Sequence, residues 1–280
     1  MCLPKYKGKT PGSDRISYKM LKSLDPIGKL RLLELYIIFE SSIIPHDWKV
    51  ATVVSIPKPE KDLLLASSYR PISLITCLSK CLEKIIATRL SWFTKTKQLI
   101  SPHQVAFKAN QSCADALLHI DHYVNSALSA AQHVTILSID FEKAFDRIGS
   151  HVILKTLKNW GVGPKMFNFI KSYLTNRRIR VRVNNTYSNI FQLYNGIPQG
   201  SPLSVVLFSI AFNEISKIIN CHTNLDHCLY ADDLYIMCKY IDNHNTNLAL
   251  SRVVKDILNW GENSGTKISL NKTSKFHICK

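Results

Sequence analysis

The hydrophobic positions of the chain follow two spacings, one typical of helices and the other typical of strands. Leu78, Leu82, Ile86 and Leu90 recur at four-residue steps, so they form one packing stripe and predict an amphipathic helix. Residues 49–56 are instead rich in β-branched side chains and predict a strand that the following prolines stop.

Two helix starts can be placed from capping residues. Asp25 precedes Pro26, which puts a capping carboxylate before a proline at the first helical position. The helix that follows is expected to continue through Ile38. Ser112 and Asp115 have the spacing of a capping box and predict a further amphipathic helix.

The second half of the chain has the strictest alternation. Residues 178–183 alternate between arginine and β-branched residues, so a strand here carries three arginines on one face. A turn at 184–185 is expected to return the chain through residues 190–193 as a hairpin. The other expected elements are a helix over 150–160 ended by Gly161, a helix over 164–176, a helix over 202–219, a helix over about 247–263 and a closing strand over 276–278.

The charge of the chain indicates a polyanionic partner. The 280 residues carry a formal net charge of +16, and Lys and Arg that neutralise phosphates release condensed counterions. Nucleic acid fits best, although a merely basic protein is consistent with the charge alone. The length is enough for one large domain or two closely joined lobes.

The cysteines and the apolar runs indicate a compartment. The eight cysteines include no Cys-x-x-Cys pair and no cluster with zinc-finger spacing, which favours a reduced intracellular location. No signal peptide is visible, and no apolar run approaches the ~20 residues of a membrane span. We therefore expect an intracellular, non-secreted protein without a membrane, in the nucleus, the cytoplasm or both. The longest apolar run, near 203–212, predicts a buried helix.

Two acidic segments carry the candidate chemistry. Asp232 and Asp233 lie between two apolar runs that are short enough to be the strands of a hairpin. On this motif alone, an exposed turn and a metal site are equally good interpretations. Residues 134–140 predict a β-branched strand that ends on Asp140. If the two strand ends meet, three carboxylates converge and form a magnesium site.

At these residues a family resemblance becomes specific. Residues 140–146 (DFEKAFD), 195–204 (NGIPQGSPLS) and 230–233 (YADD) occur in the order seen in reverse transcriptases. The chain resembles the polymerase domain of a non-LTR (LINE-type) retrotransposon, and residues 69–72 (YRPI) share that character. A group II intron or retron-type polymerase fits these segments less well.

The resemblance implies a fold and a function. The fold is an α+β right-hand polymerase, with a fingers-like lobe over 1–132, a palm-like lobe over 133–280, an antiparallel palm sheet packed on helices and a thumb that is largely missing. The activity is RNA-directed DNA synthesis, in which two Mg²⁺ ions (with Mn²⁺ as an alternative) assist transfer of a deoxynucleotide to a primer 3′-hydroxyl. The expected partners are template RNA, a DNA primer and dNTPs. An endonuclease and a thumb region are expected in a longer polyprotein.

The resemblance also assigns roles to residues. Catalysis and metal binding fall to Asp140, Asp232 and Asp233, with the backbone carbonyl of Phe141 as a further metal ligand. Nucleotide binding is expected at Lys58, Arg70, Phe145, Gln199, Gly200 and Lys272, and nucleic-acid binding at Arg178, Arg180, Arg182 and Tyr230.

Some of these roles are more specific than others. Phe145 is expected to exclude a 2′-hydroxyl, Arg70 to hold the triphosphate with its fork of donors, and Lys272 to neutralise or protonate pyrophosphate. For Phe145 a core aromatic is the plain alternative. Lys58 has the alternative of a solvated loop charge, and the basic face of residues 178–182 that of a solvated strand.

Departures from the family pattern leave a second function open. Val105–Ala106 replaces an aromatic residue and glycine, Lys108 replaces a common arginine, and Val205–Val206 replaces a frequent proline. None of these touches the three aspartates. The alternative is a catalytically inactive RNA-binding remnant of such an element.

Overall fold

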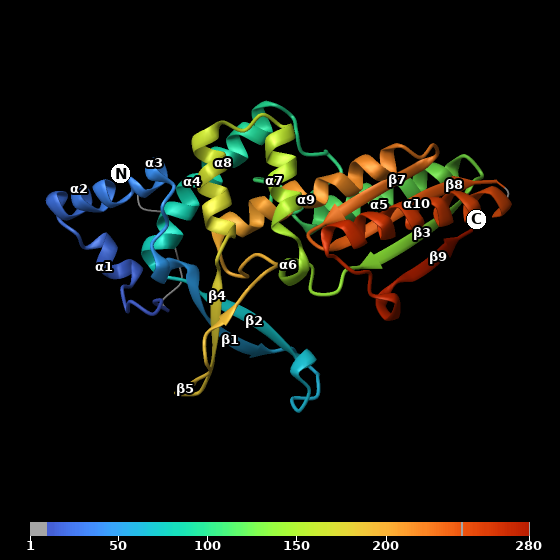
Figure 1. The fold of residues 1–280 in the computed structure, drawn as a ribbon. Helices are drawn as coiled ribbons and strands as arrows, with labels where there is room; N and C mark the ends of the chain where they lie inside the picture. Colours follow the sequence, from blue (N-terminus) through green and yellow to red (C-terminus); the bar gives the residue numbers. More distant parts are fainter. Residues whose placement is uncertain (1–9, 242, 280) are drawn as a thin grey trace. The chain divides into compact units, whose positions relative to one another are not determined.

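The computed structural model describes residues 10–241 and 243–279 and has a mixed α+β architecture (Figure 1). The chain divides into two compact units, each built from two segments. Unit 1 comprises Met1–Phe93 and Leu154–Val206, and unit 2 comprises Thr94–Ile153 and Leu207–Lys280. The α+β class expected from the sequence is confirmed. The division into functional lobes at residue 132 stays a prediction, because the compact units are defined by packing and not by function.

The elements follow one another in this order: α1 (Tyr18–Lys22), α2 (Pro26–Leu35), α3 (Ile38–Ser41), η1 (His46–Lys49), β1 (Val50–Pro57), η2 (Ala66–Ser68), β2 (Tyr69–Leu74), α4 (Cys77–Thr96), α5 (Cys113–Ser129), β3 (His133–Asp140), α6 (Ala144–Arg147), α7 (Ser150–Asn159), α8 (Pro164–Leu174), β4 (Arg178–Val183), β5 (Thr186–Tyr187), β6 (Phe191–Gln192), α9 (Pro202–Asn220), β7 (Leu225–Tyr230), β8 (Asp233–Tyr240), α10 (Asn243–Ser264), η3 (Leu270–Lys272) and β9 (Ser274–Ile278).

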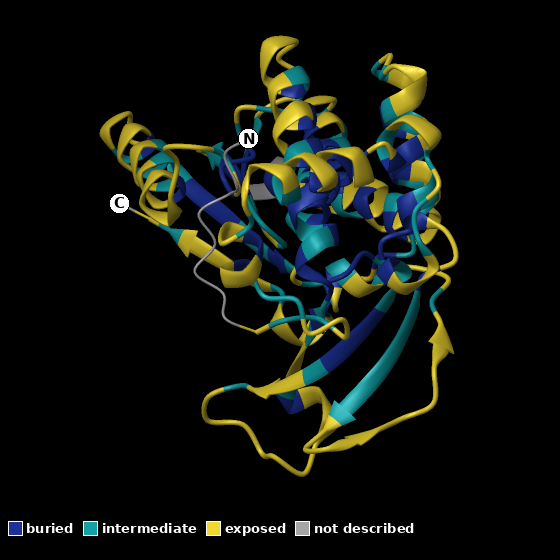
Figure 2. Cartoon of the chain, turned by 90° about the vertical axis from the view of Figure 1, so that its left-hand side faces the viewer, coloured by how far each residue is buried: buried dark blue, intermediate teal, exposed yellow. Residues whose placement is uncertain are grey.

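The sheet of unit 1 has the order β2-β1-β4-β5, with β6 also paired to β4. Strand β1 is antiparallel to β2 and parallel to β4. In Figure 1 these strands extend away from the helices α4 and α8 of the same unit. Figure 2 shows β1 buried where it leaves the helices and exposed toward its far end, since Ala51–Val53 are buried and Ser55–Pro57 are exposed.

The sheet of unit 2 is antiparallel throughout, with the order β7-β8-β3-β9. Helix α5 packs on the face that carries Val134, Ile136 and Met237. His227 of β7 points to the opposite face of the sheet, where its ring forms a hydrogen bond with the Ser216 hydroxyl of α9. Helices therefore cover both faces of this sheet.

The predicted caps are confirmed. Asp25 accepts a hydrogen bond from the amide of Gly28 at 2.7 Å, with Pro26 at the first helical position. Ser112 and Asp115 form the capping box of α5. Gly161 ends the preceding helix with a φ of 70°.

Two predicted elements are interrupted. The helix expected from Pro26 through Ile38 breaks after Leu35 and resumes at Ile38. The returning strand of the hairpin becomes the separate strands β5 and β6. Its interruption has a local cause: the Ser188 hydroxyl accepts the Val181 amide at 2.9 Å, so a side chain replaces a ladder bond. The strand β4 and its turn at 184–185 are where the sequence predicts them.

Helix α9 contains the longest apolar run. Among the described residues it is long and apolar enough to cross a membrane by length and composition, so the expectation that no run approaches such a span was wrong. Polar residues such as Ser204 and Asn213 interrupt the apolar run, but the mean hydropathy of the helix stays high enough for a membrane span. Two-thirds (67%) of the most apolar part of α9 is buried inside the protein, as expected for the core helix that the sequence predicts.

The described cysteines are free thiols, and Cys2 lies outside the described residues. Cys77 and Cys81 are both 1% exposed on one face of α4. This placement confirms that the two residues face one core together.

Candidate functional site

The three candidate carboxylates lie at adjoining strand ends in unit 2. Strands β7 and β8 form a hairpin in which Tyr230 pairs with Asp233, so Ala231 and Asp232 make the turn. Asp140, the last residue of β3, lies opposite Asp233 in the neighbouring pair. Directly opposed residues have Cβ atoms ~5 Å apart, so this register brings all three carboxylates to one end of the sheet.

The turn itself is strained. Ala231 has a φ of 58°, in the left-handed region that costs a residue with a Cβ roughly 1–2 kcal/mol. Tyr230 is partly buried and packs against the small core of Val105, Ala116 and Cys228. The aromatic residue before the aspartates therefore anchors the hairpin to the helix α5.

Lys272 forms an ion pair with Asp140, the first of the three candidate carboxylates in the sequence. Its Nζ atom donates to both carboxylate oxygens of Asp140, at 3.0 Å and 3.1 Å. The short helix η3, which contains Lys272, follows Ser269, whose amide donates to the Asp140 carbonyl at 2.8 Å. The lysine that sequence resemblance assigns to pyrophosphate is thus brought to the aspartate centre.

The electrostatics of the centre follow from burial and crowding. Burial raises the pKa of Asp232, and the nearby Asp140 carboxylate adds to that effect while Lys272 opposes it. Burial likewise raises the pKa of Asp233, with further contributions from Asp232 and Asp140. Both groups therefore hold their protons more tightly than a free aspartate, and a positive charge placed between them is stabilised.

Two phenylalanines follow Asp140. Phe141 is 2% exposed and packs edge-on against Phe212 and Trp260, so its ring belongs to the core. Phe145 is partly exposed and stacks on Phe208, with ring centroids 4.1 Å apart and planes 4° from parallel. The Phe145 ring therefore has a rigid backing. This geometry agrees with both sequence interpretations, the steric gate and the core aromatic.

The two basic residues of the first hairpin lie close together in unit 1. Ile56 of β1 pairs with Arg70 of β2, and the amide of Lys58 donates to the carbonyl of Ser68. Arg70 is exposed. The Lys58 ammonium donates to the Ser67 carbonyl at 2.9 Å, so this side chain also closes the loop. A contact of this kind was not visible in the sequence pattern.

The segment around Gln199 packs on the same hairpin. The amide of Ser73 donates to the Gln199 carbonyl at 2.8 Å. Gly200 has a φ of 112°, and a Cβ there would lie 3.0 Å from the Ser73 carbonyl oxygen. Only glycine allows this close approach of the two backbones.

A buried polar network that the sequence did not reveal holds the start of α9. Glu83 is 1% exposed and accepts bonds from the hydroxyls of Ser79 and Ser201, and Tyr173 donates to Ser201 at 2.7 Å. Burial raises the pKa of Tyr173 well above its usual range, so it stays a neutral donor. The available signal was Glu83 itself, a carboxylate next to the apolar stripe of α4.

The arginines of β4 differ in what they contact. Arg180 donates to the Thr52 hydroxyl at 3.2 Å and lies 4.5 Å from the centroid of the Tyr187 ring. Arg182 is partly exposed beside Tyr187 in the ladder. Arg178 lines a surface pocket. Of these three guanidinium groups, that of Arg180 is therefore held by neighbours inside the unit.

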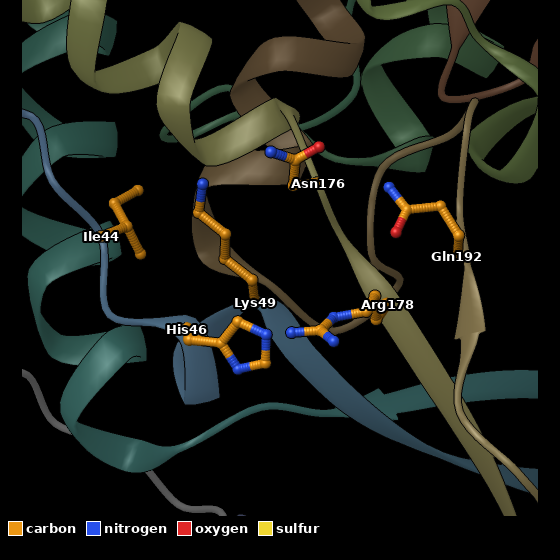
Figure 3. Close-up of a pocket in the computed structure, with 6 residues that line it drawn as sticks. All are labelled: Ile44, His46, Lys49, Asn176, Arg178 and Gln192. Carbon is orange, nitrogen blue, oxygen red and sulfur yellow. The ribbon is translucent and has the colours of Figure 1, made fainter.

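The pocket beside Arg178 has a volume of about 360 Å³ and is shown in Figure 3. None of the described residues that line it is acidic, and these residues are Ile44, His46, Lys49, Asn176, Arg178 and Gln192. Burial lowers the pKa of Lys49, and the neighbouring Arg177 lowers it further. An anion in this pocket would relieve that repulsion. Sequence reasoning missed Lys49 because it precedes a strand of ordinary composition.

The structure thus gathers the candidate residues into two groups. The aspartates, Lys272, Phe145 and Tyr230 lie in unit 2, and the candidate residues Lys58, Arg70, Gln199, Gly200 and the β4 arginines lie in unit 1. Within each group the residues come from segments that are far apart in the sequence.

Comparison with protein families and known proteins adds independent findings. Residues 56–280 match the family described as reverse transcriptase (RNA-dependent DNA polymerase). The chain is 32% identical over 235 residues to the probable RNA-directed DNA polymerase from transposon BS of Drosophila melanogaster, covering 82% of this chain and 26% of that protein. It is 26% identical to the RNA-directed DNA polymerase from mobile element jockey of the same organism, covering 94% of this chain and 29% of that protein.

Solved structures show the same fold at low sequence identity. Apo telomerase from Candida tropicalis, truncated from its C-terminal domain, superposes with a TM-score of 0.59 at 11% identity, covering 88% of this chain and 54% of that chain. Telomerase from the same organism in complex with a fragment of telomeric RNA gives 0.60 at 12% identity, covering 90% and 45%. The chain spans only about a quarter to a third of the curated relatives' length.

Proposed function

The chain belongs to the reverse transcriptase (RNA-dependent DNA polymerase) family, as a domain of the non-LTR, LINE type, and from this premise we propose that it carries the catalytic centre of an RNA-directed DNA polymerase. The observation that carries the proposal is the register of β3 and β8, which sets Asp140 opposite Asp233 beside the turn residue Asp232. The reaction is nucleotidyl transfer from a dNTP to a primer 3′-hydroxyl on an RNA template.

The proposed centre suits divalent cations. Asp232 and Asp233 have raised pKa values because they are buried and near other carboxylates, which is the arrangement that a bound cation stabilises. Oxygen ligands favour Mg²⁺, with Mn²⁺ as an alternative. Two such ions, when bound, would act as Lewis acids toward the attacking and leaving oxygens. The carbonyl of Phe141 is proposed as a further ligand.

The side chains around the proposed centre then position the substrate and neutralise its negative charge. Lys272 already bonds a carboxylate of the centre, so its ammonium is close enough to compensate charge there and to donate a proton to pyrophosphate. Phe145, backed by Phe208, presents a flat ring that cannot recede. We propose that this ring excludes the 2′-hydroxyl of a ribonucleotide, and that Tyr230 contacts the nucleic acid beside the turn.

Unit 1 supplies the proposed triphosphate and template contacts. Arg70 is exposed at the distal part of the first hairpin, where its guanidinium can bind phosphate oxygens in pairs. Lys58 lies beside it, and Gln199 and Gly200 follow on the segment that packs against β2. Arg178, Arg180 and Arg182 offer a basic strand for the backbone of template or primer.

The right-hand description is part of the proposal. We assign a fingers lobe to 1–132 and a palm to 133–280, with the thumb and an endonuclease supplied elsewhere in a longer polyprotein. Support comes from the telomerase-like fold and from relatives that are several times longer than this chain. We further propose that the protein works inside the cell as a ribonucleoprotein, in keeping with its net charge of +16 and its free thiols.

Primer extension on an RNA template tests the polymerase proposal. The 280-residue chain is incubated with Mg²⁺, dNTPs and an annealed DNA primer, and Asp232→Asn is expected to abolish product. Asp121→Asn, an exposed aspartate on α5, is the matched control and should extend the primer as the wild type does. Equal synthesis by Asp232→Asn would overturn the assignment. Salt-dependent RNA binding without any synthesis by the wild type would instead favour the RNA-binding remnant.

Nucleotide selection is tested separately. Phe145→Ala should admit ribonucleotides and lower the preference for dNTPs. Phe145→Tyr keeps the aromatic ring and should retain most of the preference for dNTPs. A discrimination ratio that is the same in Phe145→Ala and the wild type would leave Phe145 as a core aromatic.

A further inference from the structure

A second cluster of ligand-type side chains lies in unit 2, apart from the aspartate centre. His103 follows α4 in a loop, His119 is on α5 and Asp226 is near the start of β7. One ligand atom from each residue lies within 4.8 Å of the others. Asp226 precedes Tyr230 by four residues, or ~13 Å along the strand, so the cluster is at the opposite end of β7 from the catalytic turn.

The distances within the cluster suit a shared ion better than hydrogen bonds. His103 Nδ1 lies 3.3 Å from Asp226 Oδ1, and His119 Nε2 lies 3.5 Å from Asp226 Oδ2. Charge-assisted hydrogen bonds are shorter, at about 2.7–2.9 Å. Two ligands bound tetrahedrally to Zn²⁺ at about 2.0–2.1 Å stand ~3.3 Å apart. Within the described part of the chain, the buried Nε2 atom of His119 has no hydrogen-bond partner, which leaves its lone pair or proton unused.

The backbone and the neighbouring side chains hold these ligands in place. The carbonyl of His103 accepts the Leu229 amide at 2.9 Å, so the loop pairs with β7. The ring of His103 lies against that of His227, with centroids 4.4 Å apart and planes tilted by 32°, and the Nε2 atom of His227 bonds the Ser216 hydroxyl. The Asp226 carboxylate accepts the His227 amide at 2.7 Å. Such outer contacts orient ligands before an ion binds.

An ion has a path to the cluster. The side chains are 25–34% exposed, so they are neither sealed nor freely mobile. Asp226 also lines a surface cavity of about 1020 Å³ between β7, β8 and α10, all within unit 2. A hydrated cation can therefore reach the carboxylate.

We propose that His103, His119 and Asp226 form a binding site for one transition-metal ion, with Zn²⁺ as its natural occupant. Two imidazoles and one carboxylate suit Zn²⁺ rather than Mg²⁺, which prefers oxygen alone. Three protein ligands leave a fourth position for water. The ion would fasten the 99–105 loop and α5 to β7, the strand that leads into Tyr230 and the aspartate turn. This inference does not depend on polymerase activity.

Zinc binding is tested on the chelator-treated, dialysed chain. Affinity is measured by competition with a chromophoric chelator in the presence of excess Mg²⁺, and Co²⁺ is used as a spectroscopic substitute. We expect one equivalent of Zn²⁺, a tetrahedral Co²⁺ absorption spectrum without thiolate bands, and a rise in melting temperature with Zn²⁺. His103→Ala and His119→Ala should each weaken binding by roughly 100-fold or more.

Two control variants separate this site from other zinc ligands. His122→Ala removes an exposed histidine from the same helix and should bind Zn²⁺ as the wild type does. Asp232→Asn combined with Asp233→Asn removes the catalytic carboxylates and should also retain the site. The proposal is overturned if His103→Ala and His119→Ala bind as tightly as the wild type, or if the Asp232/Asp233 variant loses the ion. A Co²⁺ spectrum that is octahedral or thiolate-bound overturns it without any variant, and leaves the cluster as histidine–aspartate pairing only.

Discussion

The Lys272 ammonium lies 3.0 Å from Oδ1 of Asp140, the carboxylate that ends β3 opposite Asp233. Asp140 ends a strand far earlier in the chain, so the short helix η3 returns a basic residue to the centre at the point where negative charge is concentrated. A cation bound by Asp140 must share or displace this contact. In the proposed centre, Lys272 would therefore be both a competitor for the metal and a source of positive charge during the reaction.

Lys272→Met should separate these two effects. Removing the ammonium frees Asp140, so the Mg²⁺ concentration that gives half-maximal activity should fall. The rate at saturating Mg²⁺ should fall by roughly 100-fold, since a charge and a proton donor for pyrophosphate are lost. Primer extension across a Mg²⁺ series measures both quantities. Lys255→Met, an exposed lysine on α10, should change neither, and a Lys272→Met enzyme with wild-type turnover would contradict the role.

The aspartate pair should make the metal-free protein less stable at neutral pH. The folded-state pKa values of Asp232 and Asp233 are raised from 3.8 by burial, so the folded state binds more protons than the unfolded state in the window above 3.8. Stability from these groups is present below that window and is lost as the pH rises through it. The double variant Asp232→Asn/Asp233→Asn should therefore melt higher than the wild type at pH 7 with EDTA.

The pH series supplies the control for that prediction. The advantage of the double variant should shrink as the pH falls toward 4, and added Mg²⁺ should raise the melting temperature of the wild type alone. A wild type that melts above the double variant at pH 7 without metal would contradict the raised pKa values.

Ala231→Gly should stabilise the chain. Ala231 adopts a φ of 58°, which costs an alanine roughly 1–2 kcal/mol, whereas glycine adds roughly 0.5–1 kcal/mol of unfolded-state entropy. The first cost is larger, so the free energy of unfolding should rise by about 0.5–1 kcal/mol in urea titrations. Ala249→Gly on the helix α10 is the opposite case and should destabilise by a similar amount. A destabilised Ala231→Gly variant would mean that the turn is not strained.

Glu83→Ala should clearly destabilise unit 1. It removes the shared acceptor of the Ser79 and Ser201 hydroxyls and leaves Tyr173 with a weakened partner in a buried site. Unsatisfied buried groups cost about 1–3 kcal/mol each, so we expect a loss of about 2–4 kcal/mol in urea unfolding. Glu34→Ala, an exposed carboxylate paired with Arg31, should cost less than about 0.5 kcal/mol. A loss equal to that of Glu34→Ala would show that the network carries no energy.

Local patterns in the sequence were sufficient for most elements and for the hairpin turn that carries Asp232. Strict alternation placed β4, capping residues placed the start of α5, and an apolar run predicted the buried helix that became α9. The three aspartates were predicted from strand ends and motif order. Alternation, capping residues and the apolar run each lie within a few neighbouring residues, so a single chain shows them. Motif order spans residues 140–233 and is informative only through the family resemblance.

Contacts between distant segments were not predictable in that way. Glu83 with Ser201, Lys272 with Asp140, and His103 with Asp226 each join residues that no periodicity connects. The break between β5 and β6 was not predicted for a related reason, because it depends on one Ser188 hydroxyl that bonds across the hairpin. Such pairings depend on tertiary packing, which sequence spacing does not encode.

The bond between Ser73 and Gln199 has a mechanical consequence for how substrate is handled. Arg70 lies three positions before one partner, and Gly200 follows the other directly, so a guanidinium and an amide proposed for the incoming nucleotide belong to one stiff body. Any bending of the first hairpin would carry both groups along the same path. The proposed contacts with the triphosphate and with the base would then strengthen or weaken together. A bulkier residue at Gly200 would uncouple the two contacts.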